Sequence, residues 1–114
     1  MSFSTVVEIE FYGESEGLDI ESRKSNILKI LEKDGIHADV YTDLVELFKE
    51  QKHHFNLHPV YCFELLEKVS NLFPESDFSS RGLGEEYIFT WVSLFENGET
   101  SFKNLAWDNE NPFI

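Results

Sequence analysis

The cluster of residues that comes nearest to a metal site consists of His53, His54, His58 and Cys62. The last three are spaced four residues apart, which would place their side chains on one face of a helix. Pro59 opposes this arrangement, because its ring breaks helical continuity where His58 must stay in register with His54. Cys62 also falls on an apolar stripe. We therefore expect no metal ion or other cofactor, with the histidines in a solvated loop and Cys62 as a core thiol.

The segment from Gly82 to Glu86 has some features of a catalytic or phosphate-binding loop. Gly82 and Gly84 supply glycines, but Glu85 and Glu86 follow at once and would repel a phosphate. We expect these two carboxylates in a strand, where successive side chains point to opposite faces and cannot act as acid and base on one substrate atom. No serine lies in a nucleophile elbow. We therefore expect a protein that is not an enzyme.

The charge balance is strongly negative. Nine Lys and Arg stand against 22 Asp and Glu, for a net charge of -13 over 114 residues. This excess is larger than the roughly 2 to 8 charge units that keep a small domain soluble. It repels nucleic acids and anionic membranes, and it attracts a basic protein. We expect such a basic protein as partner, bound by a monomer in a 1:1 complex. The alternative is that the chain is acidic, as many cytosolic proteins are, without a basic partner.

Acidic clusters alternate with aromatic residues in the last third of the chain. Solvated faces are the ordinary explanation of acidic clusters, but aromatic anchors ringed by charge are the usual anatomy of a tight interface. We therefore select one set of candidate partner-binding residues. These are Glu14, Glu16, Asp19, Glu85, Glu86, Glu96, Glu99, Trp107, Asp108 and Glu110.

One domain, residues 1–114, must position these groups, since the length suits a single core and 41% of the residues are apolar. Alternation from Phe3 to Phe11 predicts a strand. Apolar periodicity predicts three helices. The first begins at Asp19 or Ser22 and ends at Asp34 and Gly35, the second begins at Asp39 or Thr42 and runs out around 51–54, and the third extends from Pro59 to Pro74.

The C-terminal half carries strand patterns. From Tyr87 to Phe95 both parities are apolar, which predicts a central strand covered on both faces. Asn97 and Gly98 predict a hairpin turn, with residues 100–107 as the returning strand. A short edge strand is expected at 77–80. Together these elements predict an α+β fold, a largely antiparallel sheet with about three helices packed on one face and a C-terminal β-hairpin.

The expected compartment is the cytoplasm. Residues 1–10 lack the basic region of a secretory signal, and Glu8 and Glu10 stand where such a signal is apolar. No apolar run approaches the roughly 20 residues of a membrane span. Cys62 is the only cysteine, so no internal disulfide can form.

The stretch 81–86, followed by Trp91, Phe95 and the pair Asn97 and Gly98, resembles segments of small bacterial immunity proteins. These proteins neutralise toxins of contact-dependent growth inhibition and related systems. The resemblance covers about a quarter of the chain and implies a cytosolic inhibitor that binds a toxin's nuclease domain. An acidic surface would then cover the basic cleft that holds phosphates, with fast and salt-sensitive association.

Two other functions fit the composition. An acidic nucleic-acid mimic or an adaptor would also bind a basic protein, and a mimic requires carboxylates at phosphate-like spacing along one face. An unrecognised small ligand-binding domain requires a deep pocket with convergent polar groups.

Overall fold

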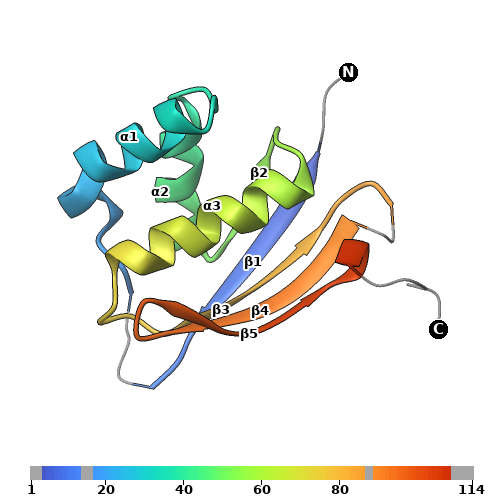
Figure 1. Cartoon of the computed structure of the whole chain (residues 1–114). Helices are drawn as coiled ribbons and strands as arrows, with labels where there is room; N and C mark the ends of the chain where they lie inside the picture. The colour runs from blue at the N-terminus through green and yellow to red at the C-terminus, as the bar shows by residue number, and fades with distance from the viewer. Residues whose placement is uncertain (1–3, 14–16, 87–88, 109–114) are drawn as a thin grey trace.

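The computed structural model describes residues 4–13, 17–86 and 89–108, which form the expected α+β fold. Five antiparallel strands lie in the order β2-β1-β3-β4-β5, and three helices pack on one face of this sheet (Figure 1). The elements are β1 (Thr5–Phe11), η1 (Ile20–Arg23), α1 (Lys24–Lys33), α2 (Val40–Glu50), β2 (Lys52–Phe55), α3 (Pro59–Leu72), β3 (Phe78–Leu83), β4 (Thr90–Glu96), β5 (Glu99–Leu105) and η3 (Ala106–Asp108).

The helix starts follow from local hydrogen bonding. Residues 20–23 form a 3-10 turn before α1 begins, and the Ser22 hydroxyl donates to the Asp19 carbonyl oxygen at 2.7 Å instead of capping the helix. Pro59 occupies the first turn of α3 as expected, and Nδ1 of His58 accepts a hydrogen bond from the Val60 N–H. Within the described ranges, no helix is both long and apolar enough to cross a membrane.

The strand from Phe78 to Leu83 is longer and more central than predicted. It pairs with β1 on one side and with β4 on the other, so the prediction of a short edge strand is wrong. The sequence signal is weak, because Ser79, Ser80 and Gly82 have low strand propensity. The edges of the described sheet are β2 and β5.

The prediction that both faces of β4 are covered is also wrong. Trp91 and Phe95 face the helices and are buried, but Val92 is 51% exposed. The helices pack on one side of the sheet, so the other side stays open although several of its side chains are apolar (Figure 1). The predicted start at Tyr87 lies outside the described residues.

The core fills the space between the sheet and the helices. Its centre is aromatic, with the Phe63 and Trp91 ring centroids 6.1 Å apart and those of Phe78 and Phe95 5.0 Å apart. The fully buried aliphatic side chains around them are Val7, Ile27, Leu31, Leu44, Leu47, Leu65, Leu66 and Val69. Among the residues that the structure describes, none forms a layer over the opposite face of the sheet.

Candidate functional site

The uncovered side of the sheet, here called the open face, carries most of the exposed apolar surface. It consists of the strand side chains that point away from the helices, with Tyr12 just beyond β1. Tyr12 is 45%, Leu83 55%, Val92 51% and Phe102 54% exposed. Among the described residues, one further large hydrophobic is exposed, Tyr61 on α3. The apolar exposure is therefore concentrated on one surface.

Strand register arranges the open face in three rows. The rows follow from the cross-strand partners of β1, β3, β4 and β5. They are Val6, Leu83 and Thr90; Glu8, Arg81, Val92 and Asn104; and Glu10, Ser79, Leu94 and Phe102. Apolar side chains thus form a band over β3, β4 and β5, with charged groups beside it on β1.

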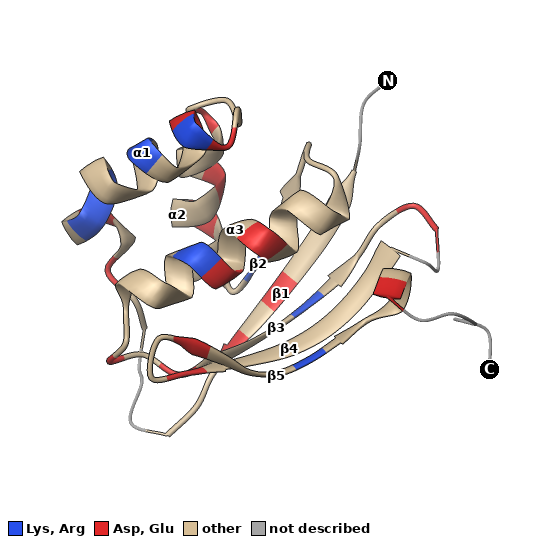
Figure 2. Ribbon diagram, viewed as in Figure 1, with Lys and Arg blue, Asp and Glu red and all other residues tan. Residues whose placement is uncertain are grey.

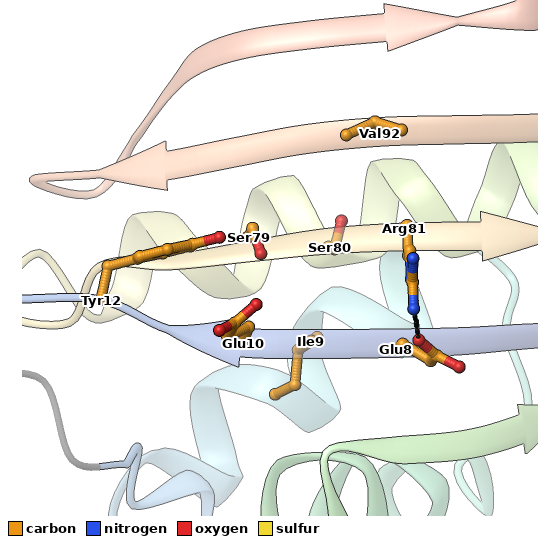
Figure 3. Close-up of a pocket in the computed structure, with 8 residues that line it drawn as sticks. All are labelled: Glu8, Ile9, Glu10, Tyr12, Ser79, Ser80, Arg81 and Val92. Carbon is orange, nitrogen blue, oxygen red and sulfur yellow. Dashed lines mark hydrogen bonds and ion pairs between the residues drawn. The ribbon is translucent and has the colours of Figure 1, made fainter.

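An ion network lies beside this band. Glu8 accepts a hydrogen bond from Nε of Arg81 at 2.7 Å and pairs with its Nη2 (Figure 3). An oxygen of the same carboxylate lies 3.4 Å from Nζ of Lys52. The hydrogen bonds from Arg81 and then Lys52 lower the pKa of the Glu8 carboxyl. At neutral pH the network holds two cations, Arg81 and Lys52, and one carboxylate, Glu8. Both cations are therefore paired within the molecule.

Two shallow hollows occupy the open face. The larger, about 570 Å³, lies between Val6, Leu83, Thr90 and Val92. The smaller, about 290 Å³, is lined by Glu8, Glu10, Tyr12, Ser79, Arg81 and other residues of the same strands (Figure 3). Both have apolar and charged walls and are open to solvent. Such a surface is suited to contact with another macromolecule through apolar and ionic groups.

The predicted acidic residues that the structure describes do not converge on one site. Glu85 and Glu86 follow β3, whereas Glu96 and Glu99 flank the hairpin turn at the other end of β4 (Figure 2). Asp108 ends η3, at the Glu85 end of β4, and Asp19 precedes η1. All six are exposed. Glu14, Glu16 and Glu110 lie outside the described residues.

Trp107 packs against the core, which gives it a structural task, and its assignment to partner binding stays a prediction. Its ring centroid lies 6.1 Å from that of Trp91 and 6.3 Å from that of Phe63. The residue is half-buried because η3 folds back over these rings. Sequence alone could not separate this aromatic from an exposed anchor, since both occur near acidic residues.

Glu85 and Glu86 lie in a bend after the end of β3, so the prediction that they belong to a strand is wrong. The Phe89 N–H donates to the Glu86 carbonyl at 2.9 Å, and the Gly84 N–H donates to the Phe89 carbonyl at 2.8 Å. A Cβ on Gly84 would lie 2.6 Å from Cγ of Pro59, so this glycine is required for packing. A Cβ on Gly82 would overlap the Trp91 ring, so the fold explains both glycines.

The histidines and Cys62 are spread over different elements. His53 and His54 lie in β2, not in a loop as predicted, and Nε2 of His53 is 2.8 Å from Oδ1 of Asp43. His54 contacts Ser4, and His58 caps α3. Burial raises the pKa of the Cys62 thiol to about 12, as fits a core thiol. Over the described ranges, no group of three or more His, Cys, Asp or Glu could hold a metal ion.

Most residues that carry the resemblance to immunity proteins have a structural task. Trp91 and Phe95 are buried, and Asn97 and Gly98 adopt the positive φ angles of 55° and 77° that the hairpin turn requires. Of the matched residues, Arg81, Leu83, Glu85 and Glu86 are among those exposed to solvent. No family model, curated protein or solved structure matches this chain.

Proposed function

We propose that this chain is a protein-binding domain that acts as an immunity protein and neutralises a basic bacterial toxin domain of the nuclease type. The uneven placement of its charge carries this proposal. Residues 20–35 hold four of the nine cations and three of the 22 carboxylates. The rest of the chain therefore holds five cations against 19 carboxylates, a net charge of -14.

This uneven charge distribution orients a basic partner as it approaches the molecule. Four cations lie on and beside α1, whereas α2, α3 and both ends of β4 carry mostly carboxylates (Figure 2). The carboxylates at the two ends of β4 are called the acidic side below, and they are Glu85, Glu86, Glu96, Glu99 and Asp108. A basic partner is attracted to the acidic side and meets less attraction at α1. A nuclease has a basic cleft because it must hold a phosphate backbone, and carboxylates that occupy this cleft exclude the substrate.

The toxin as partner rests on the resemblance of residues 81–98. Within this segment Glu85, Glu86 and Glu96 are exposed and lie on the acidic side of the molecule. Their carboxylates are available to Lys and Arg of a partner. The proposal thus combines the charge of the whole chain with the exposed part of the resembling segment.

The decisive experiment uses the protein encoded by the adjacent reading frame. Its toxic domain should arrest growth when expressed alone, and co-expression of this chain should restore growth. The purified pair should form a 1:1 complex whose association rate falls as salt rises. If growth is not restored and the two purified proteins do not bind, the proposal is wrong.

A matched pair of double variants tests the charge distribution. Glu96→Gln with Glu99→Gln removes two carboxylates on the acidic side, and Glu21→Gln with Glu32→Gln removes two at the helical layer. Both pairs change the net charge equally, and all four residues are exposed. We expect the first pair to slow association several-fold more than the second. Equal effects would contradict the proposed direction of approach.

A further inference from the structure

Four apolar side chains of the open face, Leu83, Val92, Leu94 and Phe102, occupy adjacent or diagonal positions on neighbouring strands. Val92 lies two residues from Thr90, the cross-strand neighbour of Leu83, and two residues from Leu94, the neighbour of Phe102. Side chains in such diagonal positions are about 7 to 8 Å apart and within contact reach. Single exposed hydrophobic residues are common, but a continuous patch rimmed by polar groups marks an interaction site.

Carboxylates rim this patch on several sides. Glu85 and Glu86 precede β4, and Glu96 ends it. Glu10 on β1 lies in the same row as Leu94 on β4, with Ser79 of β3 between them. A strand of seven residues spans about 20 Å, so the two acidic ends are separated by roughly that distance. A complementary surface therefore has an apolar centre with Lys or Arg groups on either side of it.

We infer that the open face is the surface on which the basic partner docks, with the patch of Leu83, Val92, Leu94 and Phe102 at its centre. This inference rests on the proposed function and deepens it. The sequence predicted that acidic residues bind the partner. In this inference several of these residues form the rim of an apolar contact surface. Buried apolar anchors supply most of the affinity, while rim charges govern the association rate.

Charge complementarity selects a basic protein over a second copy of this chain. Two copies, each with a net charge of -13, repel one another. The cations of the open face, Arg81 and Lys52, are paired with Glu8 within the same molecule. Lys103 turns to the helical side, with its Nζ 6.0 Å from the Phe63 ring centroid. The acidic rim of a second copy would thus meet repulsion from this one.

The test compares open-face variants with a matched exposed aromatic elsewhere. The probe is the toxic domain from the adjacent reading frame, made inactive by substitution of its own catalytic residue. Val92→Ser and Phe102→Ser should each weaken its binding roughly tenfold or more. Tyr61→Ser is the control, since Tyr61 is 56% exposed on α3, outside the open face, and it should change the affinity less than about twofold.

A second measurement needs no variant. Methyl resonances of Leu83, Val92 and Leu94 should shift when the unlabelled toxic domain is added, whereas those of Ile30 and Val45 on the helices should not. This readout remains available if a serine variant folds poorly. It reports the docking surface of the native chain directly.

The outcomes separate the inference from the proposed function. If the wild-type chain binds and neutralises the toxin but only Tyr61→Ser weakens binding, the inference is overturned and the function stands. If the wild-type chain neither binds nor neutralises it, the function fails and the inference with it. If sedimentation shows a homodimer of the free chain that Val92→Ser and Phe102→Ser disrupt, a second copy occupies the face and the inference is wrong.

Discussion

The indole ring of Trp91 lies over Gly82, its direct cross-strand neighbour in the β3–β4 pair. A Cβ on Gly82 would come closer than 3.0 Å to three ring carbons, so the glycine leaves the space that the indole occupies. In this position Nε1 of Trp91 donates to the Ser80 hydroxyl at 2.9 Å. The glycine is thus required by side-chain packing and not by a special backbone angle.

Gly82→Ala should destabilise the fold, because the indole must move and lose its place against Phe63 and Ser80. Overpacking of this kind costs about 1 to 3 kcal/mol of unfolding free energy. Urea unfolding followed by tryptophan fluorescence measures the loss. Gly17→Ala is the control, since a Cβ there meets no atom within 4 Å. Equal stability of the two variants would contradict the packing at Gly82.

The two buried serines beneath Trp91 should differ in importance. Ser80 Oγ accepts from the Trp91 N–H and lies 2.6 Å from Ser93 Oγ, so it is the central member of the network. Ser80→Ala leaves two buried polar groups without this partner, which costs about 1 to 3 kcal/mol. Ser93→Ala should cost less, because Ser80 still accepts from Trp91. Urea unfolding of both single variants checks the order, and a larger loss for Ser93→Ala would refute it.

The sequence predicted the elements whose signals are local. Pro59 fixed the start of α3, and Asn97 with Gly98 fixed the hairpin turn, because these residues restrict backbone angles directly. The sequence did not predict the central position of β3, because Ser80 and Gly82 are not typical of a central strand. The reason for both residues lies on the neighbouring strand, where the Trp91 ring packs over Gly82 and donates to Ser80. Such a requirement is set by tertiary packing and leaves no local pattern.

The candidate site was predicted only in part. Acidic residues are easily recognised because exposure is their default, and all the described ones selected from the sequence are exposed. The open face was missed because apolar residues of both parities in β4 indicated burial on both sides. The number of layers that cover a sheet depends on where the helices pack, and a strand's own pattern cannot reveal it.

The Glu8 carboxyl should titrate below its ordinary pKa of 4.5. Its hydrogen bonds with Arg81 and Lys52 favour the charged form, so their contribution to stability is present above pH 4.5 and is lost as the pH falls through the lowered pKa. A carbon-detected NMR titration should show the pKa rise towards 4.5 in Arg81→Gln. Lys52→Gln should give a smaller rise, because Arg81 is the stronger cause. The reverse order would contradict the assigned network.

The Cys62 thiol should be protected from reagents in the folded protein. Burial raises its pKa from 9.0 to about 12, which lowers the thiolate fraction near neutral pH about a thousandfold. Since folding raises this pKa, the thiol's contribution to stability is complete below pH 9 and is lost as the pH rises towards 12.

Reaction of the Cys62 thiol with a disulfide reagent at pH 8 should therefore be slow in buffer and fast in denaturing urea. Cys62 is the only cysteine, so Cys62→Ser should abolish the signal and serves as the control. A thiol that reacts equally fast in both solvents, while the protein in buffer remains folded by circular dichroism, would show that Cys62 is not buried.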